Sequence, residues 1–152
     1  MAIASDILTC GGPLEEAVKP KILIVDDEPD ICKVIQFLLQ REGYSIVCAC
    51  SGEEAIEAIH KDYFNAILTD WKMDGVDGMA VLKKAKEINP ITPVIIMTAF
   101  ASYESAIEAT RCGAAAYVIK PFLNEELKQT LRIIVERNRM ILEMMKDDIG
   151  PG

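Results

Sequence analysis

The chain has 152 residues, of which 51% are hydrophobic and 26% charged, and its formal net charge is −8. This length suits one α/β domain with extra residues at its ends, and the charged share argues against a largely disordered chain. The acidic balance excludes direct nucleic-acid binding by this segment, because a phosphate backbone requires clustered Lys and Arg.

The N-terminal segment, residues 1–19, shows no clear hydrophobic period and is predicted to be a loose leader. It lacks the basic start of a signal peptide, and Asp6 stands where such a peptide is apolar. No run approaches the ~20 apolar residues of a membrane span. We therefore expect a cytoplasmic protein without membrane association, and we interpret its five cysteines as small buried thiols in a reducing cytosol.

Strand-like and helix-like segments alternate from residue 20 onward. The strands are short apolar runs, of the kind buried on both faces of a parallel sheet, predicted at residues 22–25, 44–49, 65–69, 93–97 and 115–119. The helices have apolar residues at helical spacing, predicted at residues 28–42, from 51, at 79–88, at 102–112 and from about 124 to about 145. This order specifies a doubly wound (βα)5 parallel sheet of the α/β class, with helices on both faces.

Local signals refine the first two helices. The spacing of apolar residues predicts that the first helix buries one face, formed by Ile31, Val34, Ile35, Leu38 and Leu39. Ser51 and Glu54 have the spacing of a capping box at the start of the second helix.

Polar side chains follow four of the predicted strands at the point where each strand ends. Asp26 and Asp27 follow the first strand, Asp70 the third, Thr98 the fourth and Lys120 the fifth. Taken singly, such residues are often a helix cap, a strand former or a surface lysine. In a doubly wound sheet, however, the reactive site lies outside the carboxyl ends of the strands, so we expect all five to meet there.

This set of side chains indicates phosphoryl chemistry. Three clustered carboxylates repel each other, and Mg²⁺ relieves the repulsion while accepting phosphate oxygens as further ligands. A carboxylate can then attack phosphorus to give an aspartyl phosphate, while Lys120 and Thr98 offer a positive charge and a hydroxyl to the phosphoryl oxygens. The rival phosphate sites do not fit, because no GxxxxGK[ST] motif occurs and the loop of residues 26–30 is too acidic for an FMN phosphate.

These residues resemble the receiver domain of bacterial two-component response regulators. The matching segments are Ile22–Asp27 with Glu28-Pro29, Leu68–Asp70 with Met73 and Gly78, Ile95–Ala99, and Tyr117–Phe122. The resemblance covers about residues 20–135 and leaves residues 136–152 as an extension of the last helix and a tail. It implies a flavodoxin-like sheet with strand order 2-1-3-4-5.

The resemblance also implies a role for each site residue. Asp70 would accept the phosphoryl group from the phosphohistidine of a sensor histidine kinase or phosphotransfer protein, in a reaction that depends on Mg²⁺. Asp27, Asp70 and the backbone carbonyl of Lys72 would bind the metal directly, and Asp26 would bind it through water. The protein would not otherwise be an enzyme, apart from autodephosphorylation.

Three further features follow from the same resemblance. Lys120 would contact the phosphoryl group, and the Lys120-Pro121 bond would be cis. Thr98 and Tyr117 would form a switch pair, in which the hydroxyl moves toward the phosphoryl group and the ring turns inward behind it. The switch would act on the face made by the helix at 102–112, the strand at 115–119 and the last helix.

The amino-acid sequence of residues 97–100 and 115–122 is most similar to that of nitrogen-regulator-type receivers. Such receivers usually precede an ATPase domain and a DNA-binding domain. Two interpretations stay open: a stand-alone receiver, or a fragment of a longer protein. The regulated output is correspondingly a partner or an attached domain, with transcription as one candidate.

The sequence departs from the family pattern near the acceptor. Asp74 replaces a usual Pro, which adds negative charge and removes a rigid φ. Lys72 and Phe100 occupy positions where the family tunes dephosphorylation. We expect Lys72 to pair with the acidic cluster when metal is absent and Phe100 to limit water access, and we predict a phosphoryl lifetime of minutes or longer.

The last helix is longer than the fold needs. Its apolar stripe has the spacing 4-3-4-3-4, formed by Leu127, Leu131, Ile134, Asn138, Ile141 and Met145. Read as heptads, this stripe places Asn138 at an a position, where Asn favours a parallel dimer, so a homodimer through this helix is one interpretation. A fraying, charged extension is the other.

Two other functions were weighed against the phosphorylated switch. A phosphohydrolase with Asp70 as nucleophile would normally have an acidic residue two positions later, where Lys72 stands. A degenerate receiver that only binds partners would not retain all five polar positions at the strand ends.

Overall fold

The computed structural model describes residues 19–99 and 101–148, so most of the predicted leader, Phe100 and the last four residues lie outside it. Five strands form one sheet: β1 (Lys21–Val25), β2 (Ser45–Ala49), β3 (Ala66–Asp70), β4 (Val94–Thr98) and β5 (Ala116–Ile119). All neighbouring pairs are parallel, and the order is β2-β1-β3-β4-β5. The predicted flavodoxin-like sheet is therefore confirmed.

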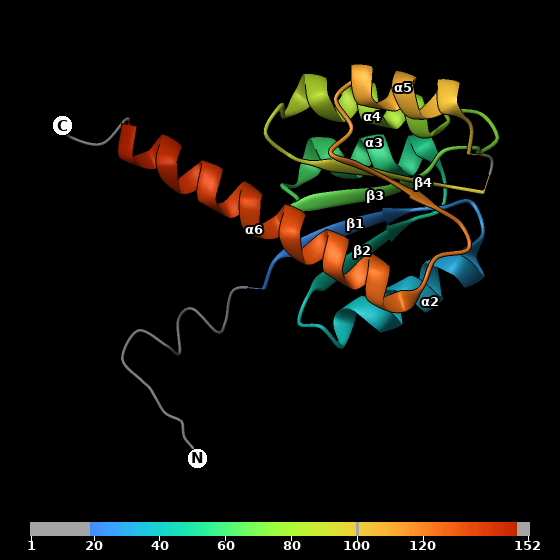
Figure 1. Cartoon of the computed structure of the whole chain (residues 1–152), viewed down its shortest axis with the longest axis horizontal. Coiled ribbons are helices and arrows are strands. Elements are labelled where there is room, and N and C mark those ends of the chain that lie inside the picture. Colours follow the sequence, from blue (N-terminus) through green and yellow to red (C-terminus); the bar gives the residue numbers. More distant parts are fainter. Residues whose placement is uncertain (1–18, 100, 149–152) are drawn as a thin grey trace, which may run out of the picture.

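In the described part of the chain, five helices cover the sheet: α2 (Pro29–Gln40), α3 (Gly52–Lys61), α4 (Gly78–Ile88), α5 (Tyr103–Arg111) and α6 (Asn124–Asp148). Figure 1 shows α2 and α6 on one face and α3, α4 and α5 on the other. Among the described residues, no helix combines the length and apolarity needed to cross a membrane.

Two hydrophobic layers hold the helices to the sheet. Alternate residues of β1 serve the two layers: Leu23 and Val25 pack with α3 and α4, and Ile22 and Ile24 pack with α2 and α6. All four are completely buried, as are most of the apolar residues of β3 and β4. This explains why the strands are continuous apolar runs rather than alternating ones.

The first helix buries the predicted face only in part. Ile35 and Leu39 are buried as predicted, Ile31 and Leu38 are partly buried against the same core, and Cys32 is buried as well, whereas Val34 is 64% exposed. The sequence has more apolar residues on α2 than the sheet can cover, and the thiol of Cys32 packs against backbone carbonyl groups at the ends of β1 and β2. The surplus apolar residues form a surface described below.

The capping box predicted for α3 is only half formed. The Ser51 side chain accepts the Glu54 N–H, but the Glu54 carboxylate accepts the N–H of Cys50 instead of that of Ser51. A complete, reciprocal capping box occurs on α5, between Ser102 and Ser105. Its usual Glu or Gln is replaced by Ser, which is why the sequence pattern did not reveal it.

The far end of α6 also differs from the heptad interpretation. Asn138 is only 3% exposed, and its side-chain amide donates to the Tyr63 hydroxyl at 3.1 Å. The helix therefore stays against the domain as far as Asn138. This residue belongs to the monomer's own packing, and the prediction that it occupies a dimer a position is wrong.

The loop between β3 and α4 is held by a close backbone approach at Gly78. Its N–H donates to the Trp71 carbonyl at 2.9 Å. A Cβ at this position would overlap the carbonyl oxygen of Asp70 and lie 2.9 Å from the Trp71 Cα. Since both neighbours are backbone atoms, neither can rotate away.

We predict that Gly78→Ala lowers the free energy of unfolding by about 3 kcal/mol, because an overpacked site must shift the backbone at the end of β3. Gly43→Ala is the matched control: Gly43 has φ +97° but open space around it, so it should lose about 1 kcal/mol from conformation alone. Urea denaturation of both variants measures the difference. Equal losses would contradict the steric explanation.

Candidate functional site

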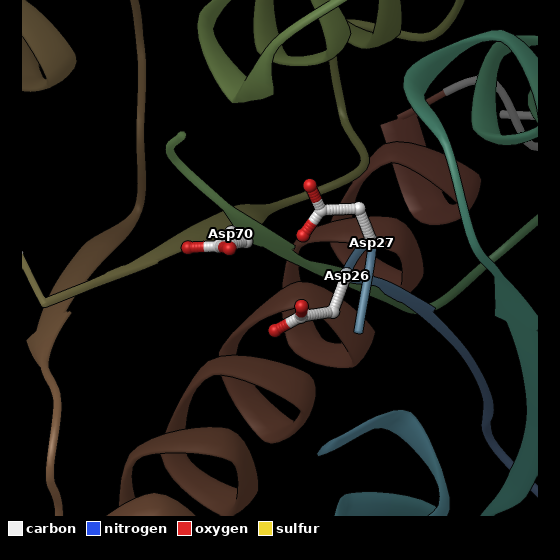
Figure 2. Close-up of side chains that lie close together, drawn as sticks. All are labelled: Asp26, Asp27 and Asp70. Carbon is white, nitrogen blue, oxygen red and sulfur yellow. The ribbon is translucent and has the colours of Figure 1, made fainter. Parts of the chain in front are cut away.

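The ends of β1 and β3 bring three carboxylates together. Asp26 and Asp27 follow β1 directly, and Asp70 is the last residue of the adjacent strand β3. One oxygen from each carboxylate lies within 4.8 Å of the others, and Figure 2 shows the three side chains close together. Asp26 is completely buried, Asp70 is half-buried and Asp27 is exposed, so the cluster opens toward solvent on one side.

Lys120 supplies the positive charge in this cluster. Its Nζ lies 2.9 Å from Asp26 Oδ2 and 3.5 Å from Asp70 Oδ1, and its side chain is 15% exposed. Burial lowers the pKa of Lys120, but its hydrogen bond and attraction to Asp26, and then to Asp70, raise that pKa above the usual lysine value. The lysine is therefore fully charged at neutral pH.

Backbone groups fix the orientation of two carboxylates. Asp26 Oδ1 accepts the N–H of Glu28 at 3.0 Å, at the start of α2. Asp70 Oδ1 accepts the N–H of Trp71 at 2.9 Å. Burial raises the pKa of Asp70; the attraction of Lys120 offsets part of this rise, and the charge on Asp26 adds to it.

The predicted switch residues lie on β4 and β5, on the other side of β3 from β1. Thr98 is 1% exposed at the end of β4, and its carbonyl accepts the Lys120 N–H at 2.7 Å. Tyr117 lies in β5, and its hydroxyl is 2.6 Å from the Ser105 hydroxyl of α5. The Lys120-Pro121 bond is cis, as the sequence predicted.

Two residues near the site were not predicted to matter. Trp71, directly after Asp70, is 8% exposed, and its ring meets the Tyr117 ring edge-on, with centroids 6.4 Å apart. Ser105 contacts Tyr117 and closes the α5 cap. An aromatic residue next to the acceptor was a signal for Trp71, whereas nothing in the local sequence linked Ser105 to Tyr117.

Of the two residues predicted to tune dephosphorylation, Lys72 and Phe100, the structure describes only Lys72. Lys72 is exposed, and within the described part of the chain the ion pairs to the acidic cluster come from Lys120. The expected pairing of Lys72 with the cluster is therefore wrong, because the better-placed Lys120 already provides that charge. Phe100 lies outside the described residues.

An apolar groove of about 490 Å³ borders the cluster. Surplus apolar residues of α2 form one wall, including Ile31, Val34 and Leu38, and Phe122 lies on the other. Lys120 lines the same groove, so it links this surface directly to the carboxylates. The sequence pattern assigned these α2 residues to a buried face, but here they line an open groove.

The donor set fits a hard divalent cation. Carboxylate oxygens from three residues converge, one of them exposed, which suits Mg²⁺ because it keeps several waters and takes few protein ligands. Lys120 stands on one side of the carboxylates and the side facing solvent is open, so an anionic phosphoryl group has both a positive contact and access.

The raised pKa of Asp70 has a consequence for metal-free protein. An aspartate whose pKa rises on folding adds stability at pH values below its ordinary pKa, about 3.9, and loses that contribution as pH rises through the folded value. We predict that Asp70→Asn in EDTA is as stable as wild type at low pH and more stable at pH 7. Thermal unfolding across this range measures the gain, and a loss of stability at pH 7 would contradict it.

Comparisons with known proteins identify the fold and the family. The family model for the response regulator receiver domain matches residues 22–132. The receiver domain protein (CheY-like) from Methanospirillum hungatei superposes with a TM-score of 0.79 at 29% identity, covering 81% of this chain and 98% of that one. TrrA from Thermotoga maritima, solved in complex with Mg²⁺-BeF, gives a TM-score of 0.70 at 32% identity, covering 77% and 99%.

The relatives with curated names are longer proteins. The transcriptional regulatory protein ZraR of Salmonella typhimurium is 40% identical over 121 residues, which cover 80% of this chain and 27% of ZraR. The regulatory protein AtoC of Escherichia coli is 38% identical over 127 residues, covering 84% and 27%. The chain thus spans about a quarter of these relatives, which are consistent with the predicted nitrogen-regulator type. The chain belongs to the response regulator receiver domain family of two-component systems.

Proposed function

We propose that Asp70 is the phosphoryl acceptor of this receiver and that phosphorylation changes its signalling face. The observation that carries the proposal is the convergence of Asp26, Asp27 and Asp70 within 4.8 Å, beside the Nζ of Lys120. A receiver is a signalling domain and not a classical enzyme. Its own chemistry would be limited to accepting the phosphoryl group and releasing it by autodephosphorylation.

The proposal gives each residue of the site a role. An oxygen of Asp70, which is partly exposed, attacks phosphorus while the bond from phosphorus to the donor's histidine nitrogen breaks. Asp27, Asp70 and the Lys72 carbonyl would hold Mg²⁺, with Asp26 reaching it through water, and the bound metal would supply positive charge to the phosphoryl oxygens. Lys120, already 3.5 Å from Asp70, contacts one of these oxygens.

The apolar groove beside Lys120 suggests where the donor binds. A phosphohistidine must come within bonding distance of Asp70, so the donor protein has to cover the adjacent surface. Ile31, Val34 and Leu38 provide an apolar contact there, on the rim of the site. We therefore propose that a sensor histidine kinase or phosphotransfer protein docks on this groove, in the cytoplasm.

The output is proposed to pass through Thr98 and Tyr117 to the face made by α5, β5 and α6. This face carries exposed apolar side chains suited to a partner, including Tyr103 at 80% and Ile119 at 53% exposure. The relative ZraR is a transcriptional regulatory protein, so control of transcription through a partner or an attached domain is the proposed output.

Incubation with Mg²⁺ and acetyl phosphate, followed by intact mass measurement, tests the proposal. We expect one added phosphoryl group on wild type and none on Asp70→Asn or when EDTA replaces Mg²⁺. Asp74→Asn is the matched control, since Asp74 is an exposed acid in the same loop but outside the cluster, and it should retain the adduct. Multiple turnover of acetyl phosphate without an adduct would point to a phosphohydrolase, and no reaction to a degenerate receiver.

We also propose that α6 pairs with α6 of a second copy, through a different stripe from the one predicted. Figure 1 shows α6 projecting past the sheet, where the described part of the chain does not cover it. Ile133, Met140 and Met144 are between 50% and 64% exposed. They are spaced by seven and four residues, as in a coiled-coil seam.

Equilibrium sedimentation at tens of micromolar tests the pairing. We expect a dimer for wild type and a monomer for Met140→Glu with Met144→Glu, because two charges would be buried in the seam. Phe37→Glu is the matched control, since Phe37 is 63% exposed on α2, and it should remain dimeric. A monomeric wild type at this concentration would defeat the proposal.

A further inference from the structure

Thr69 is a completely buried polar residue one position before Asp70. Side chains alternate along a strand, so Thr69 lies on the same face of β3 as Ile67, which packs in the layer of α3 and α4. Its hydroxyl donates to the backbone carbonyl of Asp70 at 3.1 Å. A buried hydroxyl costs free energy unless it is hydrogen-bonded. Here the hydrogen bond that offsets this cost goes to the backbone of the proposed acceptor.

The peptide group that Thr69 contacts also orients the acceptor carboxylate. The Asp70 carbonyl and the Trp71 N–H belong to one planar peptide group. The Trp71 N–H donates both to the Met97 carbonyl of β4 and to Asp70 Oδ1, each at 2.9 Å. Its one proton is therefore shared between two acceptors in a three-centre hydrogen bond. A rotation of the peptide plane would change the share that Oδ1 receives, and Thr69 holds the carbonyl end of that plane.

We infer that Thr69 is a positioning residue for phosphoryl transfer, because its hydroxyl fixes the Asp70–Trp71 peptide group and this group fixes Asp70 Oδ1. The inference rests on the proposed function of Asp70 as the acceptor. Lys120 Nζ lies 3.5 Å from the same oxygen, so the Trp71 N–H and the lysine together define its place. A carboxylate is planar, so a fixed Oδ1 also restricts the second oxygen. Attack on phosphorus requires an oxygen in the right place, and a small displacement lowers the rate.

Thr92 provides a matched control away from the site. It is 3% exposed, and its hydroxyl donates to the Phe64 carbonyl at 3.3 Å. Thr92 precedes β4 and Phe64 precedes β3, so this contact lies at the opposite edge of the sheet from Asp70. A change from Thr to Val at position 69 or 92 removes a buried hydroxyl that binds a backbone carbonyl. The two variants differ in whether that carbonyl belongs to the acceptor.

The test is the rate at which the whole chain gains a phosphoryl group from acetyl phosphate in Mg²⁺, followed by intact mass over time. We expect Thr69→Val to slow the reaction about fivefold, the factor for one net hydrogen bond. Thr69→Ala, which also lacks the hydroxyl, should be slowed as well. Thr69→Ser, which keeps the hydroxyl, should react at the wild-type rate, as should Thr92→Val.

The backbone amide resonance of Trp71 gives a second measurement that does not depend on the reaction. In nitrogen–proton NMR spectra of the unphosphorylated protein, this resonance should shift in Thr69→Val and stay in place in Thr69→Ser and Thr92→Val, because only the first change releases the peptide group. Thermal unfolding of the same variants shows that each is folded. A loss of stability alone would affect Thr69→Val and Thr92→Val alike.

A wild-type rate in Thr69→Val would overturn the inference, as would equal slowing in Thr92→Val, a slow Thr69→Ser or an unshifted Trp71 resonance in Thr69→Val. Each of these results leaves the phosphoryl adduct of the wild-type protein intact, so the proposed function would survive them. Failure of the wild-type protein to form the adduct would overturn the proposed function together with the inference.

Discussion

The ion pair between Lys120 and the fully buried Asp26 is the interaction on which the site depends. A buried carboxylate beside two others is tolerated only when a positive group lies next to it, and breaking such a pair costs about 3–5 kcal/mol. Lys120 joins the end of β5 to the end of β1, with β4 and β3 between them in the sheet. The parallel order of the strands therefore brings Lys120 to Asp26, and the charge of Lys120 in turn allows Asp26 to be buried. The same lysine stands ready for a phosphoryl group, because its Nζ already lies near Asp70.

The sequence was sufficient to predict what repeats regularly along the chain. Strand runs, helix periods and the polar residues at strand ends placed Asp26, Asp27, Asp70, Thr98 and Lys120 at one edge of the sheet, and the structure brings them there. What it did not predict were contacts between elements far apart in sequence. The Ser105–Tyr117 hydrogen bond joins α5 to β5, and no local pattern records the distance between two hydroxyls across that gap.

Two predictions failed for the same physical reason. The spacing of apolar residues along a helix does not reveal which neighbouring surface covers them. On α2 the pattern placed Val34 in the core, but the sheet covers only one side of the stripe, and Val34 lines the groove beside Lys120. On α6 the opposite happened: Asn138 was assigned to a second copy, yet Tyr63 of the same chain covers and bonds it. In both cases the spacing was correct, and the extent of the neighbouring surface decided the outcome.

The unequal burial of the helices explains why a switch would act through α5. Of the residues in α5, all of them described, Ala109 alone is buried, whereas α4 buries five. On α6, Leu127, Leu131 and Ile134 are buried and Asn138 bonds Tyr63, so the part of this helix that lies on the domain resists displacement. A helix with few buried contacts moves at the lowest free-energy cost. Because Ser105 in α5 bonds Tyr117, the element that is easiest to move is also the one in contact with the switch residue.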